Sequence, residues 1–249
     1  MTNVFGDNIP LLGFGLMRLP LKEGKVDIET FKKMADMFLK RGFTYFDTAY
    51  FYHGGESETA FKEAVSSKYP RNTYFFADKM PIYAVKKEGD CEEFFTNQLE
   101  RTGAGYFDYY LLHAVHENTY YDNVEKFKIC DFCVQQKKKG LIRHFGMSFH
   151  DTPEVLEKIL TTHPEIEFVQ LQINYDDWES PKVRARECYE TVRKHGLPVI
   201  IMEPVKGGSL AVMTPEIQAI LEKADPGASP ASWAIRFAAS LSGLVTVLS

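Results

Sequence analysis

Apolar runs alternate along the chain with longer amphipathic stretches. The apolar runs predict β-strands, and most of them are continuously hydrophobic, as is typical of a sheet covered on both faces. Strands are expected in this way at residues 11–16, 44–47, 74–78, 109–112, 143–147, 168–173, 199–202 and 244–248.

The amphipathic stretches predict α-helices between these strands. In the first of them, Phe31, Met34, Ala35 and Phe38 recur at the helical period, and Asp27 precedes them as an N-cap. Helices are expected at residues 28–40, 57–66, 90–101, 124–139, 152–160, 181–194 and 229–241.

This regular alternation predicts an α/β fold, a (β/α)8 TIM barrel formed by residues 1–249 as a single domain. The length of 249 residues suits one such barrel, which typically has about 250. An open doubly wound sheet is the alternative that the same pattern allows. Because the eighth strand is followed only by Ser249, we expect the barrel to lack its final helix.

Several predicted strands end on polar side chains that can take part in chemistry. Asp47, Lys79 and His113 lie at the ends of three consecutive strands, and Ser148 and Asn174 follow two later ones. In a parallel barrel these ends meet around one mouth, which is where active sites lie. The pattern therefore predicts the position of an active site.

Tyr52, in the loop after Asp47, completes a group that can transfer a proton. A phenol has a pKa of about 10, and we expect a neighbouring Lys79 ammonium to lower it by a few units. Asp47 would hold Lys79 charged. His113 would donate a hydrogen bond to a carbonyl oxygen that gains negative charge. Such a group suits the reduction of a carbonyl compound.

At these residues the chain resembles the aldo-keto reductase family. The similar stretches are residues 12–20, 46–49 with Tyr52 and 57–58, 79–81, 108–113 and 146–148, together with Gln172. The resemblance spans essentially the whole chain. It implies an oxidoreductase that reduces an aldehyde or ketone by hydride transfer from NAD(P)H, with Tyr52 as the proton donor.

The resemblance also implies a nicotinamide cofactor, NADPH or alternatively NADH, bound without a Rossmann fold. Ser148 and Gln172 would hold the nicotinamide carboxamide, with Asn174 nearby. Met202 would lie at the face of the nicotinamide, where many members of the family stack a tyrosine.

Residues 202–208 resemble a branch of the family whose longer members carry a C-terminal iron–sulfur domain. Lys206, Gly207 and Gly208 are expected to contact the cofactor pyrophosphate, since lysine supplies charge and glycine allows close backbone approach. No cysteine-rich tail follows, so no cluster is expected in this chain. The family's segment for the adenosine 2′-phosphate would follow Ser249, which leaves the choice between NADPH and NADH open.

The composition of the chain limits which kinds of binding partner are expected. A net charge of −5 argues against a broad nucleic-acid-binding surface. There is no apolar signal region and no apolar run of about 18 residues, so a cytoplasmic protein without a membrane span is expected. Cys130 and Cys133 form a C-x-x-C pattern, but we interpret the four cysteines as buried hydrophobic residues and expect no metal site. The expected partner is a small-molecule carbonyl substrate.

Two other functions fit parts of the pattern. The first is a barrel that binds the cofactor with little turnover and acts as a sensor or an interaction module, which the chain end at Ser249 motivates. The second is a non-redox barrel, such as an aldolase that forms a Schiff base with Lys79.

Overall fold

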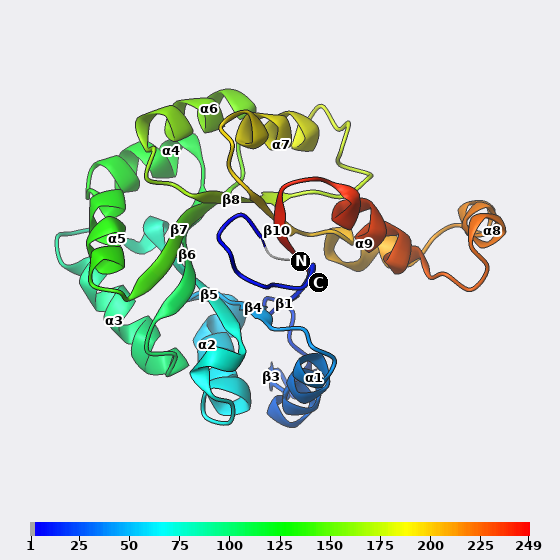
Figure 1. Ribbon diagram of the computed structural model, residues 1–249, viewed down its shortest axis with the longest axis horizontal. Helices are drawn as coiled ribbons and strands as arrows, with labels where there is room; N and C mark the ends of the chain where they lie inside the picture. The colour runs from blue at the N-terminus through cyan, green and yellow to red at the C-terminus, as the bar shows by residue number, and fades with distance from the viewer. Residues whose placement is uncertain (1–2) are drawn as a thin grey trace.

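Eight parallel strands close into a barrel that is surrounded by helices (Figure 1). The computed structural model describes residues 3–249. Around the barrel the strands follow the order β1 (Leu12–Gly15), β10 (Leu244–Leu248), β9 (Val199–Met202), β8 (Phe168–Gln172), β7 (Ile142–Phe149), β6 (Phe107–Val115), β5 (Phe75–Met80) and β4 (Tyr45–Asp47). The predicted barrel is confirmed, and the open-sheet alternative is wrong.

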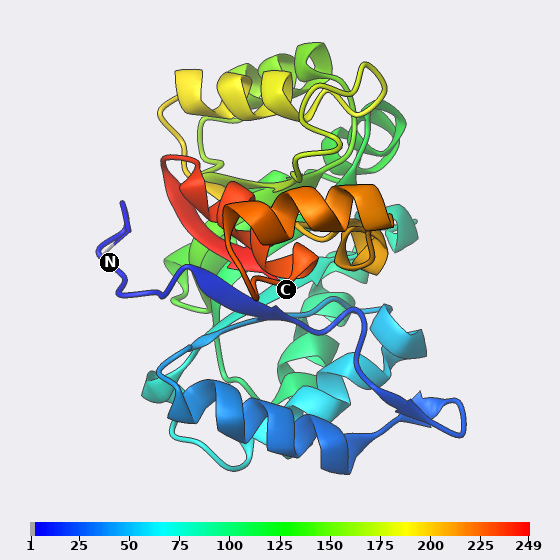
Figure 2. The ribbon, with the colours of Figure 1, turned by 90° about the vertical axis from the view of Figure 1, so that its right-hand side faces the viewer.

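The barrel closes where the first strand meets the last. β1 pairs in parallel with β10, with Leu12 opposite Val247, and on its other side with β4, with Gly15 opposite Asp47. Figure 2 shows β1 and β10 side by side at the centre of the molecule. This closure leaves no open sheet edge in the barrel, and the carboxyl ends of all eight strands face the same mouth.

The main helices agree with the hydrophobic pattern to within a few residues. Asp27 caps the first of them, because its carboxylate accepts a hydrogen bond of 3.1 Å from the Thr30 N–H. These helices are α1 (Ile28–Lys40), α2 (Glu56–Phe61), α3 (Asp90–Thr102), α5 (Ile129–Lys138), α6 (Pro153–Thr162), α7 (Ala185–Lys194) and α9 (Pro230–Ser240).

The structure differs from the prediction at some helix starts and in the loops. Lys128 and Arg184 have positive φ angles, 50° and 53°, which delays the starts of α5 and α7. Neither residue type marks such a conformation in a sequence. The helix predicted at residues 57–66 continues past α2 as the short π-helix η2 (Lys62–Ser66). The elements that the pattern did not predict are β2 (Leu21–Lys22), β3 (Lys25–Val26), α4 (Glu117–Thr119), α8 (Pro215–Ala224) and the short helical turns η1 (Tyr52–Gly55), η3 (Arg71–Thr73), η4 (Ile82–Ala84), η5 (Tyr120–Glu125) and η6 (Lys206–Ala211).

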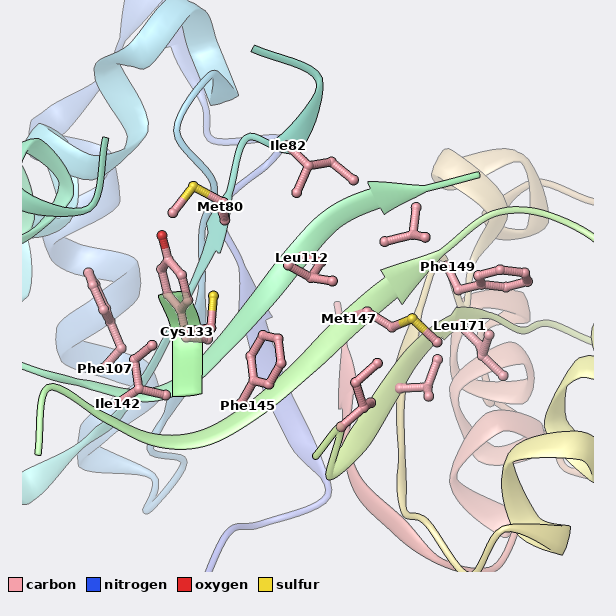
Figure 3. Packing of buried hydrophobic residues seen from close by; sticks show 14 of the residues in the cluster. Met80, Ile82, Phe107, Leu112, Cys133, Ile142, Phe145, Met147, Phe149 and Leu171 are labelled. Carbon is pink, nitrogen blue, oxygen red and sulfur yellow. The ribbon is translucent and has the colours of Figure 1, made fainter. Parts of the chain in front are cut away.

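The hydrophobic core has two parts, one between the strands and the helices and one inside the barrel. Figure 3 shows side chains of the first part, among them Leu112, Phe145 and Met147 on their strands. The second part fills the barrel with side chains such as Tyr109 and Phe168. Among residues 3–249, no helix has both the length and the apolar character that crossing a membrane requires.

Strand alternation decides which residues of β5 face the mouth. Ala77 belongs to the cluster inside the barrel, whereas Phe76 and Met80 belong to the outer cluster. Successive side chains point to opposite faces of a strand. Lys79 therefore points into the barrel and Asp78 points out toward the helices.

Candidate active site

Three of the predicted catalytic residues form a contact group at the mouth. Asp47 closes β4 and Lys79 lies on the neighbouring β5, so the barrel closure itself sets them side by side. The Lys79 ammonium donates to Asp47 Oδ1 at 2.5 Å and to the Thr48 carbonyl at 2.7 Å. It lies 3.5 Å from the hydroxyl oxygen of Tyr52, which η1 carries into the mouth.

Lys79 and Asp47 form a buried ion pair, with exposed fractions of only 1% and 3%. Burial lowers the pKa of Lys79, but Asp47, together with Tyr52 and Asp78, outweighs burial and holds that pKa above its ordinary value. Burial raises the pKa of Asp47, against the opposing charge of Lys79. Lys79 is thus held as a cation next to the Tyr52 hydroxyl.

The pKa of Tyr52 corrects one expectation from the sequence. We expected Lys79 to lower it, but burial of the phenol outweighs the ammonium, and the net pKa of Tyr52 is raised. The phenol is therefore protonated at neutral pH, and the ammonium 3.5 Å away stabilises the phenolate that forms when the proton leaves. A protonated phenol is the form that a proton donor must have.

His113 faces Tyr52 across the mouth, with the two ring centroids 5.7 Å apart. Burial, assisted by the charge of Lys79, lowers the pKa of His113 to about 3. The imidazole is therefore neutral at neutral pH and can donate a hydrogen bond without carrying charge. Its Nδ1 atom is buried and has no hydrogen-bond partner among the described residues.

An irregularity in β6 directly after His113 shapes this part of the site. Ala114 has a φ angle of 56°, and the pairing with β7 shifts register between Leu112 and Val115. The Ala114 N–H leaves the strand ladder and donates to the Ser148 hydroxyl at 2.8 Å. Bulges of this kind re-aim side chains and occur next to active sites. Sequence patterning did not predict this one, because Ala114 does not mark a bulge.

Two cavities meet at Tyr52. One, of about 520 Å³, runs along β1 and the loop after β9, and Met202, Gly207 and Gly208 line it. The other, of about 510 Å³, contains Lys79 and His113. Ser148, Gln172 and Lys206 also line the second cavity, and Met202 lines both. The structure therefore brings most of the predicted catalytic and cofactor-binding residues around one connected space.

The polar residues predicted to bind the cofactor already have partners in the protein. Ser148 accepts the Ala114 hydrogen bond, and Gln172 donates to Asp177 at 2.8 Å. Asn174 is fully buried, lies outside both cavity linings and donates to Asp177 at 2.9 Å. The roles of these residues in binding a cofactor remain predictions.

The loop after β9 has an unusual backbone. Glu203 and Lys206 have φ angles of 57° and 51°, and Gly207 and Gly208 have 65° and 96°. A run of left-handed residues, two of them not glycine, is rare and is kept where the surroundings impose it, often at functional sites. The Lys206 ammonium is bound by Asp177 at 2.8 Å and by Asp176. Lys206 therefore faces the second cavity as an ion-paired residue.

Residues that the sequence patterns did not single out also contribute to the site. Gln170 lines both cavities, its amide lies 3.4 Å from Asp47 Oδ2, and its Oε1 atom has no partner among the described residues. Arg18 and Glu203 form an ion pair of 2.6 Å between the loop after β1 and the loop after β9. Their positions in sequence, far apart, offered no signal for this contact.

The four cysteines are free and buried, as expected. Cys130 has His163 and Glu165 as neighbours in a group that could hold a metal ion. The two ring nitrogens of His163 already contact Glu165 at 2.8 Å and Glu125 at 2.7 Å, so hydrogen bonding to carboxylates accounts for the group. The absence of a metal site remains a prediction.

Comparisons with known proteins identify the family and the fold of the chain. The family model described as "Aldo/keto reductase family" matches residues 11–249. A search of curated proteins found no match. A thermostable aldo-keto reductase, solved in complex with the inhibitor epalrestat, is 21% identical with a TM-score of 0.80, covering 100% of this chain and 88% of its own.

Two further solved structures have the same fold. An aldo/keto reductase from Klebsiella pneumoniae, solved with NADP and acetate, is 20% identical with a TM-score of 0.71, over 96% of this chain and 80% of its own. An aldo-keto reductase from Bacillus halodurans, in its holo form, is 22% identical with a TM-score of 0.72, over 97% and 82%.

Proposed function

The chain belongs to the aldo/keto reductase family, and on this basis we propose that it reduces an aldehyde or ketone with a hydride from NADPH, with NADH as the alternative donor. Tyr52 is the proton donor in this proposal. The observation that carries it is the contact of the Lys79 ammonium with both Asp47, at 2.5 Å, and the Tyr52 hydroxyl, at 3.5 Å.

Each of the four catalytic residues has one task. Tyr52 is protonated and gives its proton to the carbonyl oxygen as that oxygen gains negative charge. Lys79 stabilises the phenolate that remains, and Asp47 keeps Lys79 charged and in place. His113, held neutral by burial, donates a hydrogen bond to the same carbonyl oxygen.

The residues around Tyr52 fit a nicotinamide dinucleotide. Met202 offers an apolar side chain at the point where the two cavities meet, and Gly207 and Gly208 let the backbone approach a ligand closely. Gln170 Oε1, which has no hydrogen-bond partner within residues 3–249, is an acceptor that an amide group can satisfy. The cofactor, when bound, supplies the hydride. Relatives crystallised with NADP and NADPH support the choice of NADPH.

Within the family, we place this chain with the branch that residues 202–208 resemble. The other functions weighed from the sequence fit less well. A Schiff base requires a neutral amine, whereas the Lys79 ammonium is ion-paired and its pKa is raised. A cofactor-binding sensor with little turnover is one of the outcomes of the test below.

The test is a Tyr52→Phe variant, assayed with NADPH and a panel of aldehydes and ketones. The loss of the proton donor is expected to lower kcat by about 100-fold or more. NADPH affinity, measured by the quenching of protein fluorescence, should change little. Tyr50→Phe is the control, since Tyr50 packs against Phe51 and Phe94 and has no role in the proposed mechanism.

Equal rates for Tyr52→Phe and the parent would show that the mechanism is wrong. Tight NADPH binding by the parent without turnover of any carbonyl compound would favour the sensor instead.

A further inference from the structure

A pair of acidic residues that the proposed mechanism does not use lies directly behind the catalytic lysine. Asp78 precedes Lys79 on β5 and points outward, and Glu58 comes from α2. Both side chains are fully buried, with exposed fractions of 0%. They lie within hydrogen-bonding reach of one another, and neither has a role in the proposed mechanism.

The bonding of these two carboxyl groups is incomplete if both are ionised. Arg101 Nε lies 2.8 Å from Glu58 Oε2 and supplies one positive charge. Gln98 donates to Glu58 Oε1 at 3.3 Å, and Asp78 Oδ1 accepts the Lys79 N–H at 2.8 Å. Asp78 Oδ2 has no donor among the described residues. Two adjacent buried carboxylates would repel each other, and one proton between them removes the repulsion and supplies the missing bond.

The same network holds the backbone of Lys79 on both sides. The Asp78 carboxylate accepts a hydrogen bond from the Lys79 N–H. The Gln98 amide, which also contacts Glu58, donates to the Lys79 carbonyl oxygen at 3.0 Å. The Tyr110 hydroxyl in turn donates to Gln98 at 2.6 Å. The position of the Lys79 ammonium against Tyr52 therefore depends on the outer face of the barrel wall.

We propose that Asp78 and Glu58 share one proton, and that this acid pair is the support that positions Lys79 for the reaction. Asp78 is a positioning residue, because it touches Lys79 and not the reacting atoms. This proposal rests on the proposed function for its effect on activity, but the sharing of a proton does not.

The shared proton makes both stability and activity depend on pH. Burial, against the charge of Arg101, raises the pKa of Glu58 to about 7, and burial together with Glu58 raises the pKa of Asp78 well above its ordinary value. The charged or titratable groups that face the pair are Arg101 on α3, Lys79 on β5, Tyr110 on β6 and Tyr52 on η1.

The direction in which stability changes with pH follows from the binding of this proton. The folded chain holds the proton more tightly than the unfolded chain, so this contribution to stability is complete below the unfolded pKa of about 4 and is lost as the pH rises through the folded pKa. Because the folded pKa of Glu58 is about 7 and that of Asp78 is raised well above its ordinary value, the loss begins near neutral pH and continues as the pH rises.

Asp78→Asn is the discriminating variant, since its amide imitates a permanently protonated Asp78. It should donate to Glu58 and still accept the Lys79 N–H. We expect kcat within about twofold of the parent at pH 6. Above the pKa of Glu58, about 7, the parent begins to lose the shared proton, so at pH 9 Asp78→Asn should retain the larger share of its activity.

Asp78→Ala removes both hydrogen bonds and should lower kcat by about tenfold or more, because small displacements of catalytic groups are costly. Its KM should change little, which separates a displaced Lys79 from a damaged substrate site. Glu92→Gln on α3 is the control, since Glu92 is an exposed acid on the same helix as Arg101. Circular dichroism checks that each variant is folded.

Thermal unfolding tests the shared proton without any assay of activity. Between pH 5 and pH 9 the Tm of the parent should fall more than that of Asp78→Asn, by roughly 5 °C or more. Equal slopes in the two proteins would overturn the shared proton. An Asp78→Asn variant as inactive as Asp78→Ala would overturn the positioning role. An inactive parent with the expected Tm difference would refute the proposed function alone.

Discussion

The buried pair of Lys79 and Asp47 provides the sharpest test of how the site is held. Asp47→Asn leaves an ammonium that is 1% exposed without its carboxylate. At the observed separation of 2.5 Å, the attraction is about 7 kcal/mol with an effective dielectric of 20. The cost of taking both charges out of water offsets much of this. Breaking such a pair from one side typically costs about 3–5 kcal/mol.

We therefore expect Asp47→Asn to lower the free energy of unfolding by about 3–5 kcal/mol at pH 7. Lys79→Met should be similarly costly at pH 7, because Asp47 is then buried alone. The pKa of Asp47 is already raised by burial, and the loss of the opposing Lys79 charge would raise it further. Lys79→Met should thus be most stable at low pH, below the unfolded pKa of about 4, and lose stability as the pH rises.

The assay is urea unfolding of the parent, both single variants and the Asp47→Asn/Lys79→Met double variant. The double variant should be more stable than the sum of the single effects implies, because no unpaired charge remains. The exposed pair of Lys68 and Asp36, at 2.7 Å, is the control, and its single variants should cost less than about 1 kcal/mol. Additive single effects, or an Asp47→Asn cost below about 1 kcal/mol, would refute the reasoning.

Two further predictions concern other parts of the barrel. A Cβ on Gly146 would lie 2.5 Å from the carbonyl oxygen of Phe168, so Gly146→Ala should destabilise the protein by about 1–3 kcal/mol or more in urea unfolding. Gly15→Ala is the control, because the atom nearest to a Cβ there is 3.9 Å away, and it should cost about 0.5 kcal/mol or less. His113→Ala should lower kcat by about 100-fold or more, because one hydrogen-bond donor to the carbonyl oxygen is lost. Since the pKa of His113 is lowered to about 3, the pH–rate profile of the parent should show no histidine titration between pH 5 and pH 8, and a step near pH 6.5 that His113→Ala abolishes would contradict this.

Local patterns predicted the barrel because each strand and helix carries its own signal. The strands are buried on both faces, so they read as apolar runs, and α1 has a cap at Asp27 and a helical period of buried residues such as Phe31 and Ala35. α8 contains no buried residue, so its sequence does not show a buried face. The late start of α5 after Lys128 could not be predicted either, because the positive φ angle of Lys128 depends on what packs around it.

Some parts of the candidate site could be predicted from the sequence, and others could not. Asp47, Lys79 and His113 could be predicted because they lie at or near the carboxyl ends of consecutive strands, and these ends share one mouth in a parallel barrel. The bulge at Ala114 and the contact of Arg18 with Glu203 could not be predicted, since each depends on segments that meet only after folding.

The sequence by itself determined the strands, the main helices, the barrel and the chemical types at its mouth, because these depend on the residue order within short segments. Only the tertiary structure decided the protonation of those groups. Burial sets Tyr52 as a protonated phenol and His113 as a neutral imidazole, against what exposed side chains with the same neighbours would do. Only the structure brought Asp78 and Glu58 together behind Lys79. The physical reason is that a pKa depends on the surrounding solvent and charges, and distant parts of the chain supply these in three dimensions.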